Sequence, residues 1–325
     1  MTFNKVNNPD SSAFKPALDD LKGAVDSPSA WLRQAMAVNR KQGSIESNGA
    51  KINYFEWGDP SKPGLLLLHG FLSHARCFAF IAPFLADDYH IVAYDLSGMG
   101  DSDSRGDYPD DIRATEALDV ATHTGLFKNT SKPTLISHSY GGTVGINLIN
   151  THPDKFAGLV ISDLMVIRPK ILKKHASNFK RPGKQDRDRP NRVYPNLEAA
   201  KSRFVLVPPQ KVEHQELLDF MAYHSLKEVD GGYTWKFSPS VYPKDEDAQG
   251  RWSKVGERIV ALPGKVAIIY GSESMLFTPD SEDYIRELGG DRIPIINIPH
   301  AHHHLMLDQP IAYVTALHTL LKAWQ

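Results

Sequence analysis

The sequence has a single cysteine, no long apolar run and almost no net charge. Each of these features argues against one kind of bond, segment or partner. The lone Cys77 cannot form an intramolecular disulfide. The strongest apolar run near the N-terminus covers only residues 65–68, far short of the roughly 20 residues that cross a bilayer. The 37 basic and 38 acidic residues leave a formal net charge of −1, so the overall charge gives no reason to expect a nucleic-acid partner.

The remaining composition is that of an ordinary globular chain. Apolar residues make up 41% and charged residues 23% of 325 residues, which suits one large core or a core with an inserted subdomain. The opening residues, MTFNKVNNPDSSAF, lack the apolar stretch of a secretory signal. We therefore expect a cytoplasmic protein without a membrane span, present as a monomer or homodimer.

Segments typical of strands alternate with segments typical of helices in two parts of the chain. Strands are expected at 51–57, 65–69, 89–94, 133–137, 156–162, 265–270 and 292–298. Helices are expected at 76–85, 110–127, 140–152, 279–288 and 310–324. This alternation predicts an α/β fold with a mostly parallel central sheet flanked by helices.

The alternation also predicts the domain boundaries. Residues 1–42 read as an N-terminal extension with a helix that begins at Ser27-Pro28, a serine cap before proline, and runs to about Arg40. Residues 43–163 and 263–325 would form the core. Residues 164–262 break the rhythm and predict an inserted, largely helical cap.

The predicted cap contains two features that are open to two interpretations. Ten lysines and arginines between Arg168 and Arg192 would either attract an anionic substrate or form a solvated loop. Its large apolar side chains would either wall an acyl pocket or form the cap's own small core; they are Met221, Tyr223, Tyr233, Trp235 and Phe237.

The strongest functional signal is the segment SHSYGG at residues 137–142. A buried strand leads into it and a helix follows it, so the turn at Ser139 is sharp and its backbone strained. Such a turn needs small residues two positions to either side, and Ser137 and Gly141 qualify. The segment resembles the G-x-S-x-G nucleophile elbow of the α/β-hydrolase superfamily, with Ser137 in place of the first glycine. The resemblance implies the α/β-hydrolase fold and a nucleophilic Ser139.

Two further segments resemble that family in the same order along the chain. His69-Gly70 resembles its H-G segment, which implies that the N–H groups of Phe71 and Tyr140 form an oxyanion hole. The loop at residues 95–102 resembles its D-x-R-G-x-G-x-S loop, with Ser97 in place of arginine, and we interpret it as structural.

The general base is expected in the histidine run near the C-terminus. In the family, the catalytic histidine precedes an acidic residue and a proline, and counting back from Asp308 and Pro310 selects His303. His302 and His304 are the alternatives in register. Three adjacent histidines also suggest a metal, but side chains on an extended loop diverge and no second ligand motif is present. We expect neither metal nor cofactor.

The acid of the triad has two candidates. The family position after the seventh strand holds Ser274, with Glu273 beside it, whereas part of the superfamily takes its acid from the end of the sixth strand, where Asp163 lies. We favour Asp163, with Glu273 as the alternative and Ser274 as an accessory that bonds the histidine. Three other residues are interpreted separately: Cys77 as a core residue, His138 as structural and pointing away from Ser139, and His74 as a candidate pocket residue.

The resemblance implies a serine hydrolase with a small-molecule acyl substrate. We expect a carboxylic-ester hydrolase that acts through an acyl-enzyme on a small or medium acyl group. The same residues would serve a C–C bond hydrolase, lactonase, thioesterase or perhydrolase, whereas a serine nucleophile argues against the dehalogenases and epoxide hydrolases of the superfamily. A binding protein with little turnover is the alternative of another class.

Overall fold

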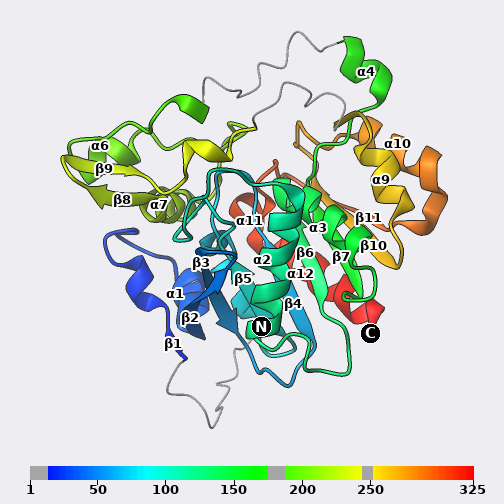
Figure 1. Cartoon of the computed structure of the whole chain (residues 1–325), viewed down its shortest axis with the longest axis horizontal. Helices are drawn as coiled ribbons and strands as arrows, with labels where there is room; N and C mark the ends of the chain where they lie inside the picture. Colours follow the sequence, from blue (N-terminus) through cyan, green and yellow to red (C-terminus); the bar gives the residue numbers. More distant parts are fainter. Residues whose placement is uncertain (1–13, 175–186, 244–251) are drawn as a thin grey trace.

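A nine-stranded sheet forms the centre of the computed structural model, which describes residues 14–174, 187–243 and 252–325 (Figure 1). The strand order is β1-β2-β3-β5-β4-β6-β7-β10-β11. All pairs from β5 to β11 are parallel, and the three pairs from β1 to β5 are antiparallel. The predicted mostly parallel sheet is therefore confirmed. The strands are β1 (Lys15–Pro16), β2 (Asn39–Ser47), β3 (Ala50–Trp57), β4 (Gly64–Leu68), β5 (His90–Tyr94), β6 (Thr134–His138), β7 (Gly158–Ser162), β10 (Lys265–Gly271) and β11 (Ile295–Ile298).

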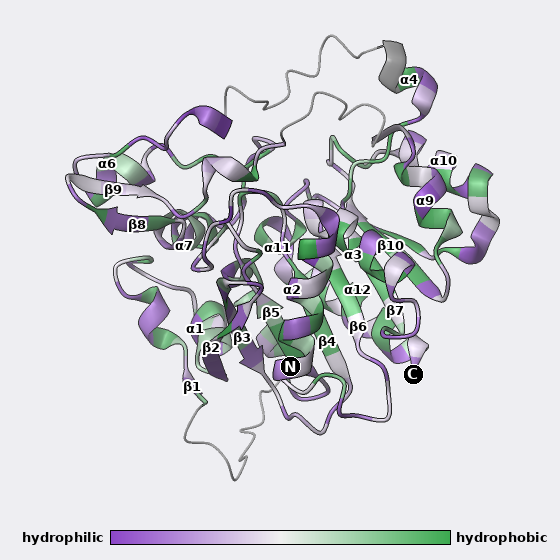
Figure 2. Cartoon of the chain, in the orientation of Figure 1, coloured by the Kyte–Doolittle hydropathy of each residue, from purple (hydrophilic) through white to green (hydrophobic). Residues whose placement is uncertain are grey.

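Helices cover both faces of the sheet because alternate strand residues point to opposite sides. In β4, Leu65 and Leu67 join one core with α1 and α12, whereas Leu66 and Leu68 join a second core with α2 and α3. Figure 2 shows hydrophobic residues concentrated along the central strands. The helices are η1 (Leu18–Leu21), α1 (Ala30–Met36), η2 (Ala75–Phe78), η3 (Ala82–Phe84), α2 (Asp110–His123), α3 (Tyr140–Thr151), α9 (Val255–Ala261), α10 (Pro279–Gly289), η6 (Gly290–Arg292), α11 (Leu305–Asp308) and α12 (Pro310–Trp324).

Two local predictions differ from the structure. The N-terminal helix is capped by Ser29, whose hydroxyl accepts from the Leu32 N–H at 3.4 Å, and it ends at Met36. The segment that follows is strand β2, which pairs along its length with β3, so the expected boundary at residues 42 and 43 falls inside a strand. The expected helix at 76–85 is two short 3₁₀ helices, the second with Pro83 in its first turn.

The segment predicted to be the cap contains a hairpin as well as helices. Figure 1 shows α6, α7, β8 and β9 gathered together at one side of the sheet. The hairpin is a departure from the expected largely helical content, because Gly231 and Gly232 adopt positive φ and turn the chain back. The elements are α4 (Pro169–Lys174), α6 (Leu197–Lys201), α7 (Gln215–His224), β8 (Leu226–Val229), β9 (Gly232–Trp235) and η5 (Pro239–Val241).

A partly buried ion network joins the N-terminal segment, the sheet and the segment after β9. Asp20 accepts from the Arg40 guanidinium at 2.8 Å, and Arg76 lies between Asp20 and Asp101. The Lys236 ammonium reaches Asp101 at 2.6 Å. Burial alone would raise the pKa of Asp101, but Arg76 and Lys236 outweigh it and hold that pKa well below its usual value. These contacts fix the proposed cap against the core.

Candidate active site

Ser139 sits at the turn between β6 and α3 with the strained backbone that an elbow requires. Its φ of 52° and ψ of −121° lie in a region that L-residues rarely adopt, which costs on the order of 1–3 kcal/mol. The turn brings Gly141 against β4, where an added Cβ would lie 2.3 Å from the Leu68 carbonyl oxygen. Ser137 fits in place of glycine because its buried hydroxyl donates to the Val160 carbonyl at 3.0 Å.

His303 and Asp163 form a buried hydrogen-bonded pair at the carboxyl edge of the sheet. The His303 Nδ1 lies 2.8 Å from the Asp163 Oδ1, and the two residues are 1% and 0% exposed. The carboxylate also accepts from the Ser274 hydroxyl at 2.6 Å and from the Gly271 N–H at 3.0 Å. Because a carboxylate only accepts, Nδ1 carries the proton and Nε2 is left as the basic nitrogen. This Nε2 is buried and has no hydrogen-bond partner among the described residues.

Glu273, the alternative candidate for the acid of the triad, has other partners. The side chain of Glu273 is exposed and makes a hydrogen bond of 3.4 Å with the neighbouring Ser272 hydroxyl, while its backbone N–H donates to Ala301. Of the two carboxylates, the structure brings Asp163 to His303. The expected bond from Ser274 to the histidine is replaced by a bond to Asp163, because the Ser274 hydroxyl points toward the end of β7.

The neighbours of His303 have separate partners. His302 bonds Asp308 through its backbone N–H at 2.7 Å and through Nδ1 at 3.0 Å. The His304 backbone N–H donates to the Gln210 side chain at 2.9 Å. Asp163 therefore contacts only one of the three candidate histidines, since neither His302 nor His304 is among its hydrogen-bond partners in the described chain.

His138 has a contact that the sequence did not reveal. Its ring centroid lies 4.7 Å from that of His303, and its Nε2 bonds the His303 carbonyl oxygen at 2.9 Å. Burial and the nearby His303 lower the pKa of His138 to about 3, so the ring is neutral and donates this bond. His138 thus holds the loop that carries His303. No local pattern relates positions so distant in the chain.

The H-G segment borders the elbow. A Cβ added at Gly70 would lie 3.0 Å from the His138 Nδ1 and 3.4 Å from the Ser139 Cβ, so this backbone runs directly beside the serine. The rings of Phe71 and Tyr140 meet edge to face with centroids 5.7 Å apart. The backbone segments whose N–H groups were expected to form the oxyanion hole are therefore neighbours, and their role stays a proposal.

The loop at residues 95–102 has contacts that suit a structural role. Asp95 is fully buried and accepts from the Ala75 N–H at 2.7 Å and the Asp101 N–H at 2.9 Å. Ser97, which stands in place of arginine, bonds Glu116, and the Arg113 guanidinium donates to the Ser97 carbonyl at 2.9 Å. A guanidinium from α2 thus reaches the position of the missing arginine.

Comparison with known proteins shows the family of this chain. A family model described as the alpha/beta hydrolase family matches residues 65–317. The chain belongs to this family.

Curated relatives and solved structures extend the comparison. A fluoroacetate dehalogenase from Burkholderia is 32% identical over 107 residues, covering 32% of this chain and 35% of that protein. Human epoxide hydrolase 4 is 28% identical over 149 residues, 45% of this chain and 40% of that protein. The matches thus span about a third to two fifths of these relatives.

Two solved structures share the fold along most of the chain. A Mycobacterium tuberculosis esterase superimposes with a TM-score of 0.66 over 98% of this chain and 100% of its own, at 17% identity. A thioesterase domain from the curacin biosynthetic pathway gives 0.67 over 86% and 98%, at 19% identity. At these identities the likeness shows the fold alone.

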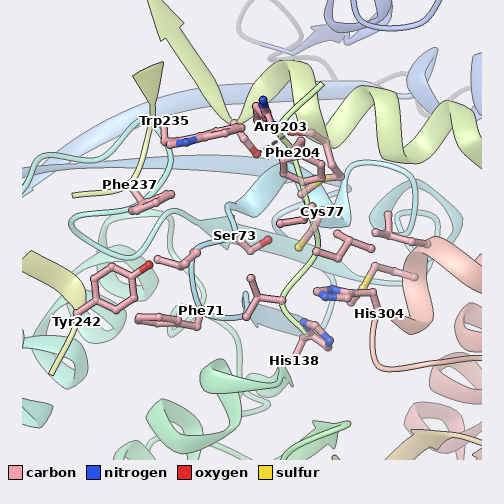
Figure 3. A pocket seen from close by; sticks show the side chains of 18 of the residues that line it. Phe71, Ser73, Cys77, His138, Arg203, Phe204, Trp235, Phe237, Tyr242 and His304 are labelled. Carbon is pink, nitrogen blue, oxygen red and sulfur yellow. Dashed lines mark hydrogen bonds between the residues drawn. The ribbon is translucent and has the colours of Figure 1, made fainter. Parts of the chain in front are cut away.

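In this α/β hydrolase a cavity of about 260 Å³ lies between the histidines and the proposed cap (Figure 3). His138 and His304 lie together at one end, and Trp235, Arg203 and Phe204 lie at the other. The core contributes Phe71, Leu72, Ser73, Cys77, His138, His304, Met306 and Leu307. The proposed cap contributes Tyr194, Arg203, Phe204, Val205, Leu206, Val207, Met221, Ser225, Trp235, Phe237 and Tyr242.

The cavity lining shows which of the large apolar side chains of the predicted cap face this space. Met221, Trp235 and Phe237 line it, whereas Tyr223 packs on His224 and Tyr233 pairs with Tyr194 through the backbone. Its lining is mostly apolar, which suits a hydrocarbon chain.

Cys77 and His74 were also singled out from the sequence, and of these two only Cys77 lines the cavity. Cys77 also lines the cavity, and burial raises the pKa of its thiol far above the usual value, so it is an unreactive wall. His74 bonds the Ser225 hydroxyl at 3.1 Å and is not among the lining residues.

The basic run contributes no side chain to this cavity within the described chain. Arg168 pairs with Asp280 and Glu287, and Arg187 donates to the carbonyls of Ser240 and Tyr242. Residues 175–186 of the run lie outside the described residues. None of the helices in the described ranges has the length and apolar character that crossing a membrane demands.

Proposed function

We propose that the protein is a serine hydrolase that cleaves carboxylic esters through an acyl-enzyme on Ser139. The observation that carries this proposal is the buried bond between Asp163 and the His303 Nδ1, which leaves Nε2 as an unpaired base in the same site as the strained Ser139, as judged over the described residues. Serine is a weak nucleophile by itself and needs such a base to attack a carbonyl carbon.

The proposed mechanism has two halves. In the first, the His303 Nε2 takes the proton of the Ser139 hydroxyl as Oγ attacks the ester carbonyl carbon. The N–H groups of Phe71 and Tyr140 hold the negative oxygen, each at a gain of about a hundredfold or more in rate. His303 then protonates the departing alcohol. In the second half, water replaces the alcohol and attacks the acyl carbon as His303 takes its proton. The bond from the acyl carbon to the Ser139 Oγ then breaks, His303 returns the proton to Oγ, and the acid is released.

The cavity supports a small or medium acyl substrate. About 260 Å³ of mostly apolar space adjoins the histidines, which accommodates a short hydrocarbon chain and excludes a large polar one. A serine at the elbow forms an ester that water can hydrolyse at the carbonyl carbon. The activities in the names of the dehalogenase and epoxide hydrolase relatives therefore do not transfer to this chain by themselves.

A fluorophosphonate probe and intact-mass analysis test the proposal. Wild type should gain one phosphonyl adduct, and Ser139→Ala should gain none, because only an activated serine attacks the phosphorus. Ser61→Ala, which changes an exposed turn away from the site, is the matched control and should be labelled like wild type. A folded wild type that gains no adduct and hydrolyses no small ester would overturn the proposal.

A further inference from the structure

His304 presents an unpaired ring nitrogen at the cavity. Its ring lines the cavity beside His138 (Figure 3), and its Nε2 is buried without a hydrogen-bond partner among the described residues. Buried polar atoms in native proteins nearly always have partners, so an orphaned one in a cavity wall points to a ligand atom. The catalytic mechanism proposed above makes no use of this nitrogen.

The ring's surroundings keep His304 uncharged. Burial, reinforced by the neighbouring rings of His303 and His138, lowers the pKa of His304 far below its usual value, so the ring is neutral. A neutral imidazole has one N–H and one bare nitrogen. A hydroxyl can both donate and accept, so it can pair with Nε2 in either tautomer of the ring.

The position of Nε2 limits where its partner can be. The His304 ring centroid lies 4.9 Å from that of His303 and 5.2 Å from that of His138. In the proposed mechanism the His303 Nε2 reaches the Ser139 hydroxyl, so a substrate carbonyl at Ser139 would lie beside the ring that neighbours His304. The cavity lining also includes the apolar side chains of Leu206, Met306 and Leu307. A hydroxyl placed beside His304 can pair with Nε2.

We propose that His304 selects substrates through a hydrogen bond at Nε2, so that the enzyme prefers esters with a hydroxyl a few bonds from the scissile carbonyl. This inference rests on the proposed ester-hydrolase function and deepens it. The hydroxyl can belong to the acyl chain or to the alcohol, since both flank the carbonyl. Without that hydroxyl, Nε2 stays unpaired when the substrate excludes water, and the transition state is bound less tightly.

Four esters of similar size test the preference. Ethyl butyrate is the reference, each enantiomer of ethyl 3-hydroxybutyrate places a hydroxyl on the acyl side, and 2-hydroxyethyl butyrate places one on the alcohol side. The measurement is kcat/KM from acid release at constant pH. Wild type should prefer one hydroxy ester over ethyl butyrate by about 2- to 10-fold, the worth of one neutral hydrogen bond. Whether the acyl-side or the alcohol-side hydroxyl is preferred identifies which side of the ester faces His304.

Variants separate a specificity role from a structural one. In His304→Phe the kcat/KM of the preferred hydroxy ester divided by that of ethyl butyrate should fall to about one, because the ring shape is kept and Nε2 is lost. His304→Gln restores a polar group that can donate or accept and should recover part of the preference. His304→Leu serves if the phenylalanine variant does not fold. His123→Phe, at the exposed end of α2, is the matched control and should keep the wild-type ratio.

The outcomes distinguish this inference from the function on which it rests. A wild type that is labelled at Ser139 but treats all esters alike would overturn the selection by His304 alone. Selection by His304 is also overturned if the preference survives in a folded His304→Phe or His304→Leu. Failure of labelling together with failure to hydrolyse any of the esters would overturn the proposed function and this inference with it.

Discussion

The Asp163→Asn substitution is expected to abolish turnover while leaving the fold in place. Asp163 faces three donors: the Nδ1 of His303, the hydroxyl of Ser274 and the backbone N–H of Gly271. An asparagine has one oxygen and one NH₂, so one side of the carboxylate becomes a donor. The Gly271 N–H is fixed by the sheet and cannot turn away. The amide oxygen should therefore stay on Gly271, and the NH₂ group should face His303 and Ser274.

That orientation reverses the histidine tautomer. With an NH₂ group opposite Nδ1, the ring accepts at Nδ1 and carries its proton on Nε2, where it can no longer take the proton of Ser139. The expected loss is about ten-thousandfold in kcat, the size that this tautomer error produces in serine hydrolases of the Ser-His-Asp type. The Ser274 hydroxyl can rotate to accept from the new NH₂, so the free energy of unfolding should fall by only about 1–3 kcal/mol.

The assay is hydrolysis of 4-nitrophenyl butyrate, with thermal unfolding as the check on folding. Glu273→Gln is the matched control, because it makes the same chemical change to the exposed carboxylate nearby, and it should keep kcat within about twofold of wild type. If folded Asp163→Asn keeps more than a tenth of the wild-type kcat, Asp163 is not the acid. If Glu273→Gln loses activity instead, the alternative acid is the working one.

Two further predictions concern stability. In Gly141→Ala the new methyl would lie 2.3 Å from the Leu68 carbonyl oxygen, which belongs to a strand and cannot move aside, so unfolding in urea should show a loss of about 1–3 kcal/mol; an unchanged midpoint would contradict the close approach. The pKa of Asp101 is held below its usual value by Arg76 and Lys236, so its stabilisation is present above the unfolded pKa of about 4 and is lost as pH falls through and below that value. Asp101→Asn should therefore lower the Tm at pH 7 and narrow the Tm difference between pH 7 and pH 3. If wild type and Asp101→Asn show the same Tm difference between these pH values, a charged Asp101 in this network is refuted.

The departures from the sequence predictions share a physical cause. Strand β2 was missed because Asn39–Ser47 is mostly polar and alternates only weakly, and its strand conformation comes from pairing with β3 rather than from its own pattern. The contact between His138 and the His303 loop was missed because it joins two segments that only the sheet brings together. The unpaired nitrogen of His304 depends on which groups surround it within the described part of the fold.

What the sequence determined by itself is the local chemistry. Small residues around Ser139 and the strand and helix on either side specify the strained turn, since backbone strain depends on immediate neighbours. The spacing from His303 to Asp308 and Pro310, through its resemblance to the family pattern, predicts His303 as the base. Only the tertiary structure distinguishes Asp163 from Glu273. Both follow neighbouring parallel strands at one edge of the sheet, and only the register of β7 with β10 and the path of each turn decide which carboxylate is buried against the histidine.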